Sequence, residues 1–446
     1  MARKRKRHLS RTRLIALGFF IMILAGTLLL MTPFASRSGT GTDFLTALFT
    51  ATSASCVTGL AVVNTYTHWS LFGQVVLLVL IQIGGLGFIT IGFGFSLFLR
   101  RRISLRARGL LQESMNVDHV NGMVRLAKLI LCGTVIFEGA GAVILTLCFL
   151  PQMGFPTALW YGIFHSISAF CNAGFDLMGR FGESSFMGYY DHPIVCLTLI
   201  VLILVGGLGF FVWADLRRHR WHFRKYALHT KLVLTFSLIL TAGGAVLFFL
   251  LERNQLFADM RTLDAAVNAL FCAVTPRTAG FNTIDTASLT EAGKLLTIIL
   301  MFIGGCPGST AGGVKVTTIA VMLLYMRSTL TRSNGVNCFG RRLTDEAVPK
   351  ATLVFTINLT LAVTATFLLS AMSGTDLVDL TFEAVSAIST VGMSLGVTSG
   401  LNAAGRLIII LLMYLGRVGS LSFAMSLTNK KGSEHVRLPK EEISIG

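Results

Sequence analysis

Charged side chains are scarce in this sequence. They make up 13% of its 446 residues, against 53% for hydrophobic ones, whereas soluble domains carry roughly 25% charged residues. This scarcity excludes an ordinary water-soluble fold. Long apolar runs are present instead, for example 14–31, 75–99, 194–212 and 407–426. Each run approaches or exceeds the roughly 20 residues that an α-helix needs to cross a bilayer, so we expect spanning helices.

Acidic residues are even fewer than basic ones, with 21 Asp and Glu against 38 Lys and Arg and a net charge of +17. Most of the basic residues fall between the apolar runs, in segments 3–13, 100–128, 217–231, 327–350 and 430–440. The positive-inside rule places these segments in the cytoplasm. We therefore expect no nucleic acid partner, both termini in the cytoplasm, an even number of crossings and contact with membrane lipid. The connections expected outside carry Arg37, Arg180, Arg253, Arg261, Arg277, Lys294 and Arg406.

Paired cysteines and catalytic clusters are also missing. The eight cysteines show no spacing typical of a disulfide framework or a zinc site. No combination of His, Cys and carboxylates suggests a nucleophile with a base, so the sequence does not predict an enzyme. The basic start followed by an apolar run resembles a secretory signal. The run is longer than the roughly 7–15 residues of such a signal, and we expect it to be the first span.

Four short segments repeat one pattern of small residues that ends in glycine and an apolar residue. They are Val57-Thr58-Gly59-Leu60, Asn172-Ala173-Gly174-Phe175, Thr278-Ala279-Gly280-Phe281 and Thr390-Val391-Gly392-Met393. Each follows an apolar stretch too short to span, at 43–55, 156–170, 263–275 and 375–388, and long apolar runs flank every pair. A single glycine of this kind usually only ends a helix. Four in register favour a repeated unit instead.

The predicted fold is an all-α polytopic membrane protein of four span–pore helix–span repeats around a pseudo-fourfold pore. It has eight transmembrane helices and four re-entrant pore helices. Two crossings per repeat give all four units the same orientation, so they can surround one axis. The predicted divisions are a basic N-terminus at 1–13, repeat 1 at 14–108, repeat 2 at 109–226, repeat 3 at 227–342, repeat 4 at 343–428 and a C-terminal tail at 429–446.

The glycine segments predict a cation site. Non-helical backbone inside a bilayer leaves carbonyls unsatisfied, which is tolerated only where it is buried in protein or lines a water-filled cavity. A ring of carbonyl oxygens can replace the hydration shell of K+. The candidate cation-binding residues are Val57, Thr58, Gly59, Asn172, Ala173, Gly174, Thr278, Ala279, Gly280, Thr390, Val391 and Gly392.

A candidate gate lies in the second span of the third repeat. Five glycines and a proline between residues 304 and 313 should break the helix inside the membrane. Arg417 occupies the place where the other repeats have the second glycine of a pair, and an ionised residue so deep in a span usually faces a cavity or a partner. A simple kink and an arginine that reaches the membrane surface remain open as alternatives. The candidate gate residues are Gly304, Gly305, Pro307, Gly308, Ser309, Thr310, Gly312, Gly313 and Arg417.

These motifs resemble the membrane subunits of the Ktr/Trk/HKT potassium transporter family over nearly the whole chain, from about residue 14. Family members have four such units with one filter glycine each, which correspond here to Gly59, Gly174, Gly280 and Gly392. The resemblance implies K+ as the ion, Na+ as a candidate activator, a homodimer in the cell membrane, and a cytosolic nucleotide-binding regulatory ring like KtrA. Only the fourth repeat keeps the channel-like Thr-Val-Gly.

The sequence leaves some hypotheses open. A Na+- or H+-coupled secondary cation carrier is the alternative to a gated pore, although the chain offers few ionisable groups for a midplane site. Glu138 and Glu383 lie in apolar helical surroundings and suit either a structural pair or an ion site. Lys315 suits either the gate or the end of its loop.

Overall fold

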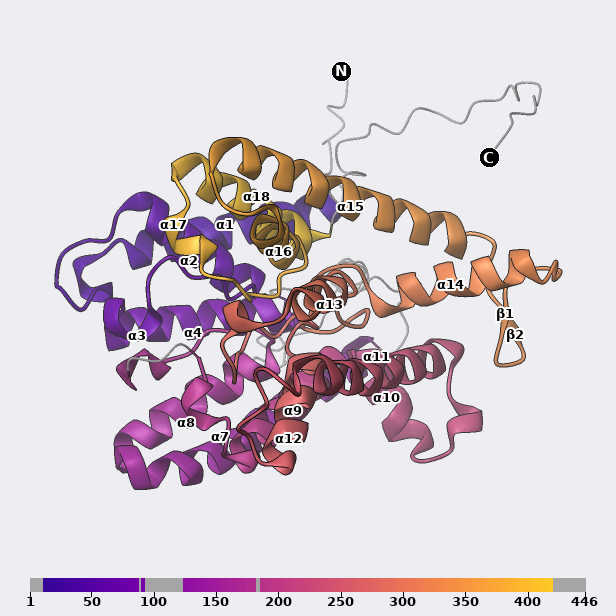
Figure 1. Ribbon diagram of the computed structural model, residues 1–446, viewed down its shortest axis with the longest axis horizontal. Coiled ribbons are helices and arrows are strands. Elements are labelled where there is room, and N and C mark those ends of the chain that lie inside the picture. Colours follow the sequence, from indigo (N-terminus) through magenta and orange to yellow (C-terminus); the bar gives the residue numbers. More distant parts are fainter. Residues whose placement is uncertain (1–10, 88–89, 93–122, 182–184, 420–446) are drawn as a thin grey trace, which may run out of the picture.

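The computed structural model describes residues 11–87, 90–92, 123–181 and 185–419 (Figure 1). The tail expected at 429–446 lies outside the described residues. The same holds for residues 1–10, for the boundary between the first two repeats and for residues 420–428. The described chain is mostly helical and has almost no sheet, which confirms the predicted all-α class.

Four long apolar helices open the four repeats. They are α1 (Arg11–Leu30), α7 (Met123–Met153), α11 (Leu228–Glu252) and α15 (Ala347–Met372). By length and composition each can cross a membrane. A fifth candidate is the pair α9 (Pro193–Gly207) and α10 (Phe210–His219), which is bent by 94° at its break. The chain is therefore polytopic, while the full count of eight crossings stays a prediction.

A short helix follows each long one at the predicted place. These helices are α2 (Phe44–Cys56), α8 (Phe155–Phe170), α12 (Thr262–Val274) and α16 (Leu377–Ile388). The short helices are too short to span a bilayer. Each ends just before its glycine segment, so the C-terminal ends of all four precede the segments predicted to bind a cation.

The second helices of the repeats each end within two residues of an aligned glycine. They are α4 (Leu71–Leu86), α9, α13 (Glu291–Phe302) and α18 (Ala403–Val418). Glycines with positive φ follow three of them at Gly87, Gly209 and Gly419. The third repeat continues as a loop into α14 (Val316–Leu330). A break was expected only in that repeat, but the second repeat also has one, between α9 and α10.

Short elements lie between the main helices, both within and between the repeats. They are η1 (Pro33–Ala35), α3 (Thr65–His68), η2 (Met178–Phe181), η3 (Met187–Tyr189), η4 (Phe223–Lys225), η5 (Thr286–Ser288), α17 (Val397–Gly400) and a hairpin of β1 (Asn337–Cys338) with β2 (Arg341–Arg342).

The four repeats form a closed ring in chain order. Within each repeat the short helix packs between the long helix and the second helix. Each short helix also contacts the second helix of the preceding repeat, in the pairs α2 with α18, α8 with α4, α12 with α9 and α16 with α13. The last repeat therefore meets the first, and the ring encloses a common centre (Figure 1).

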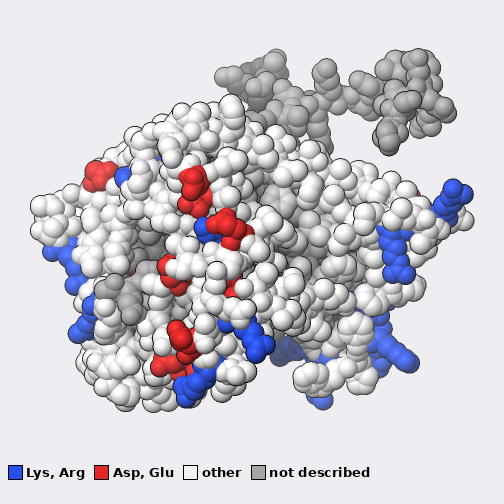
Figure 2. Space-filling view, viewed as in Figure 1, with Lys and Arg blue, Asp and Glu red and all other residues white. Residues whose placement is uncertain are grey.

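Basic side chains are visible at both ends of the face in Figure 2. The end that carries α14 and the hairpin, at the right of the figure, shows basic side chains, whereas acidic and basic side chains both lie at the left and centre. The basic end includes predicted cytoplasmic segments from 217–231 and 327–350.

Candidate cation site

The four glycines Gly59, Gly174, Gly280 and Gly392 meet at the centre of the ring. A Cβ atom added to Gly59 would lie 2.6 Å from the main-chain oxygen of Ala173, and one added to Gly174 would lie 2.9 Å from that of Ala279. The same contact continues from Gly280 to the oxygen of Val391 and from Gly392 to the oxygen of Thr58. Each glycine thus touches the carbonyl that precedes the glycine of the next repeat, and the circle closes. No residue with a side chain fits at these positions without a collision.

Each wall of this glycine ring is held by its own short helix. The N–H of the residue before the glycine donates to a main-chain oxygen near the helix end. These bonds join Thr58 to Ser53, Ala173 to Ser168 and Val391 to Ser386, all at 2.8 Å, and Ala279 to Thr275 at 2.9 Å. A trans peptide points its C=O opposite to its N–H. The carbonyls of the residues before these donors therefore point away from the helices, toward the shared centre.

Serine side chains orient a second carbonyl in two of the walls. The N–H of Gly59 donates to Oγ of Ser53 at 3.0 Å, and that of Gly392 to Oγ of Ser386 at 3.1 Å. By the same geometry the carbonyls of Thr58 and Val391 point inward. The glycines themselves have φ between 68° and 96°, a conformation that favours glycine.

Side chains two residues before each glycine surround one end of the ring. These residues, Val57, Asn172, Thr278 and Thr390, all have positive φ. Nδ2 of Asn172 donates to Oγ1 of Thr278 at 3.4 Å, so equivalent positions of neighbouring repeats touch. Oδ1 of Asn172 and Oγ1 of Thr390 are buried with no partner among the described residues. Such atoms commonly bind a water or an ion.

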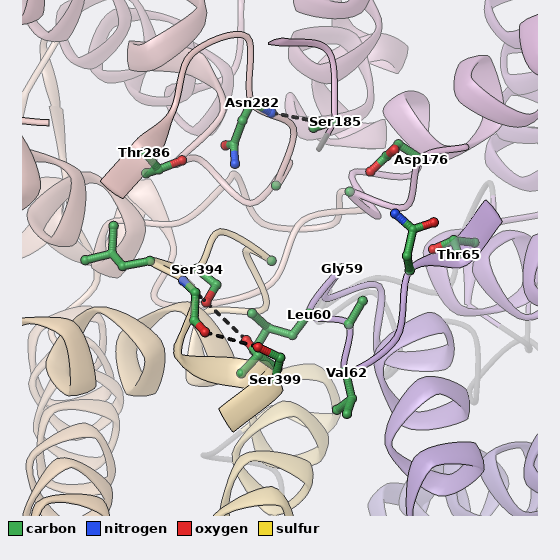
Figure 3. Close-up of a pocket in the computed structure, with 18 of the residues that line it drawn as sticks. Gly59, Leu60, Val62, Thr65, Asp176, Ser185, Asn282, Thr286, Ser394 and Ser399 are labelled. Carbon is green, nitrogen blue, oxygen red and sulfur yellow. Dashed lines mark hydrogen bonds between the residues drawn. The ribbon is translucent and has the colours of Figure 1, made fainter. Parts of the chain in front are cut away.

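A cavity of about 450 Å³ opens beyond the other end of the ring. It is lined by all four ring glycines and by the residues that follow them in each repeat (Figure 3). Asp176 and Asn282 lie on one side of this outer cavity, and Leu60 and Ser394 lie on the opposite side. Burial raises the pKa of Asp176, which stands in the loop between α8 and α9, to about 6, although the N–H groups of Met178 and Ser185 lower it.

The predicted gate segment lies at the opposite end of the ring from this cavity. It forms a loop whose ends are joined by an isolated bridge between Ile303 and Val314. The N–H of Thr310 donates to the oxygen of Gly206 at 3.3 Å, and its hydroxyl donates to the oxygen of Phe170 at 3.2 Å. A Cβ on Gly312 would meet the side chain of Thr390. The loop therefore lies directly against the ring segments.

Arg417 contacts this loop from the end of α18. Its guanidinium donates to the main-chain oxygens of Thr310 and Gly84, and to that of Gly85 at 3.0 Å. The arginine thus joins the fourth repeat to the first repeat and to the loop, and it does not reach outward to a membrane surface. Nζ of Lys315 donates to the oxygens of Ala311 at 2.8 Å and Gly312 at 3.0 Å, so the lysine also holds the loop.

Glu138 and Glu383, whose roles the sequence left open, have protein partners. Glu138 accepts from Nε2 of Gln82 at 3.1 Å, and Glu383 accepts from the hydroxyls of Ser394, at 2.7 Å, and Thr398. Among the described residues no group of His, Cys, Asp and Glu could hold a metal ion together. Glu138 therefore lies beside Gln82 of α4, and Glu383 lies beside the residues that follow the fourth glycine segment.

Sequence reasoning missed several residues that shape the site. Ser53, Ser168 and Ser386 stand six positions before their glycines, and this regular spacing could have identified them in the sequence. Gly87 and Gly209 each stand three positions after the first glycine of a pair, and Gly419 stands three positions after Gly416, which is a second regular spacing. Arg277, expected in an outer connection, is instead only 6% exposed. No pattern in the neighbouring sequence predicted that Arg277 is buried.

Comparisons with known proteins agree with this architecture. The family model described as "TrkH: Cation transport protein" matches residues 9–436. The "Potassium/sodium uptake protein NtpJ" of Enterococcus hirae is 41% identical, over 100% of this chain and 99% of that protein. The "Ktr system potassium uptake protein B" of Bacillus subtilis is 37% identical, over 97% of this chain and 96% of that protein.

A solved structure supports the same fold. The potassium transporter TrkH from Vibrio parahaemolyticus matches with a TM-score of 0.76 and 21% identity, over 96% of this chain and 87% of that one. Together with the family model and the full-length relatives, it confirms the resemblance found in the sequence. The chain belongs to the TrkH family of cation transport proteins, a family of membrane transporters and not of enzymes.

Proposed function

We propose that this chain is the ion-translocating subunit of a K+ uptake system. The observation that carries the proposal is the closed circle of glycines, each against the carbonyl of the next repeat. Inward carbonyls of several repeats at one centre can coordinate a dehydrated cation. The names of the relatives from Enterococcus hirae and Bacillus subtilis, which both include potassium, support K+ as that cation.

The surroundings of the ring favour a cation at its centre. The C-terminal ends of four short helices precede the ring segments, and these ends carry partial negative charge. The unpaired oxygens of Asn172 and Thr390 offer additional ligands at the inner end. The outer cavity with Asp176 gives hydrated ions an approach from the other side. The twelve candidate residues of the four glycine segments therefore form the proposed selectivity filter.

The loop of residues 304–313 is the proposed gate. It lies against the ring at Thr390 and obstructs the inner exit. Arg417 holds it there through the oxygen of Thr310, with Lys315 as a second clamp inside the loop. Release of these few hydrogen bonds would open the path for the ion.

The setting of the subunit follows from charge and family. We place it in the cell membrane with both termini and the basic segments in the cytoplasm. The relative from Bacillus subtilis, which is named as a Ktr system protein, supports an assembly with other subunits, for which a homodimer and a KtrA-like nucleotide-binding ring are the proposed partners. The word sodium in the name of the Enterococcus hirae relative makes Na+ the second ion to test, as activator or as coupled ion.

Ion flux in liposomes tests the function. Purified wild-type protein should carry rubidium, a K+ substitute, down a gradient without a second ion. Deletion of residues 304–313 and the substitution Arg417→Ala should each raise the flux, because both remove the obstruction. Absence of rubidium flux in every variant would refute a K+ path. Flux that strictly requires a Na+ or proton gradient would instead support the coupled carrier.

A further inference from the structure

A second guanidinium lies in the membrane region beside the ring. Arg277 stands between the end of α12 and the third glycine segment, three residues before Gly280. It is only 6% exposed, and among the described residues no carboxylate forms an ion pair with it. A charge buried in a membrane protein is costly and usually serves a function. The proposed function so far does not use this one.

The long helix α11 supplies the hydrogen-bond acceptors of Arg277. Nη1 donates to Oγ1 of Thr241 at 2.9 Å and to the main-chain oxygen of Ser237 at 3.4 Å. Nη2 donates to Oγ of Ser237 at 3.0 Å. The C-terminal end of α12, immediately before Arg277 in the chain, adds partial negative charge. These groups compensate the cation and tie the third wall of the ring to α11.

The same cluster reaches the gate loop. Oγ of Ser237 lies 3.3 Å from Sγ of Cys306, and Nη2 of Arg277 lies 4.0 Å from that sulfur. Cys306 is fully buried in the loop, and its N–H donates to the oxygen of Gly207 at 3.1 Å. Arg277, Ser237 and Cys306 thus form a continuous contact from the ring wall through a long helix to the loop.

The two arginines hold the loop in different ways. Arg417 binds main-chain oxygens at its Thr310 end, and one of those oxygens belongs to the loop itself. Arg277 donates its hydrogen bonds mainly to α11, which is not part of the loop. A cavity of about 190 Å³ lies beside Arg277 and Gly305, next to the Cys306 end of the loop. The Cys306 end is therefore held through α11, whereas the Thr310 end is held by Arg417 and by the main-chain oxygens of Gly206 and Phe170.

We propose that Arg277 is a positioning residue that anchors the Cys306 end of the loop and couples the loop to the third wall of the ring. This inference rests on the proposed function. When Arg417 releases Thr310, the loop turns about its anchored end. Because Arg277 also holds the segment that leads to Gly280, its loss disturbs ion selection as well as closure. Loss of Arg417 disturbs closure alone.

The test compares Arg277→Met with Arg417→Ala in liposomes. Both should raise the maximal rubidium flux. Arg277→Met should in addition lower the ratio of rubidium to sodium permeability by about ten-fold, which corresponds to about 1.4 kcal/mol. Arg277→Lys, which restores the charge, should recover most of the ratio. A ratio in Arg277→Met equal to that of the wild type would overturn the proposal.

Further variants keep the test decisive. Ser237→Ala removes the bridging hydroxyl and keeps the cation, so it tests the contact even if Arg277→Met fails to fold, and it should raise flux and lower the ratio in the same direction. Thr27→Val is its control, since this fully buried hydroxyl on α1 bonds only within its own helix. Wild-type behaviour of Ser237→Ala counts against the proposal. Absence of rubidium flux in the wild type would instead refute the proposed function itself.

Discussion

The glycine ring and the gate loop are both irregular backbone in the middle of the fold, yet they are stabilised differently. Each ring wall is held by its own short helix, through main-chain bonds of 2.8–2.9 Å that join residues four or five positions apart. The loop is held by residues distant in the sequence, such as Gly206, Phe170 and Arg417. Each ring wall resists displacement because hydrogen bonds within its own repeat hold it in place. A loop held by a few long-range contacts can be released by changing any one of them.

The largest effect is expected at the ring itself. Gly392→Ala places a methyl group against the carbonyl of Thr58, and the wall has no freedom to retreat. We expect rubidium flux to fall by about a hundred-fold, consistent with an overpacking cost of up to ~3 kcal/mol. Gly396→Ala is the matched control, since it has nearly the same φ and open space around it. Equal flux in both variants would show that the ring is not the ion path.

The loop should respond in the opposite direction. Gly312→Ala adds a methyl group between the loop and Thr390, where the side chain already fills the space. We expect the loop to be displaced, so that resting flux rises by roughly ten-fold for a contact change of about 1.4 kcal/mol, with no change in the ratio of rubidium to sodium permeability. Gly400→Ala, which meets nothing within 4 Å, should behave as the wild type. Lower flux in Gly312→Ala would argue that the loop supports the open path.

The same contrast explains what the sequence could reveal. The short helices and glycine segments were predicted within a residue or two because their signals are local and occur four times. The broken helix of the third repeat was visible for the same reason, from its own glycines and proline. The hydrogen-bond partners of Arg417 and the burial of Arg277 depend on residues far away in the chain, such as Gly84 and Ser237. No local sequence pattern could therefore predict these contacts. The serines six positions before the glycines form a local pattern that the sequence analysis did not use.

A smaller effect is expected from the serine supports of the ring. Ser386→Ala removes the side-chain acceptor of the N–H of Gly392 and leaves the main-chain bond of Val391 in place. A lost hydrogen bond is worth about 1 kcal/mol, so we expect the permeability ratio to fall by roughly five-fold. Ser373→Ala, whose hydroxyl bonds only to Leu369 at the end of α15, serves as control. An unchanged ratio in Ser386→Ala would mean that the main-chain bond alone orients this wall.

The smallest effect is expected at the outer cavity, outside both the ring and the loop. Because burial raises the pKa of Asp176 to about 6, its carboxyl is charged above that external pH and neutral below it. A negative charge at the mouth raises the local concentration of cations. We expect the KM for rubidium to rise roughly two-fold as the external pH falls through about 6, with the maximal flux unchanged. Asp176→Asn should show the higher KM at every pH and lose the pH dependence. If the variant keeps the pH dependence of the wild type, another group at the mouth titrates, and the cavity does not act through this carboxylate.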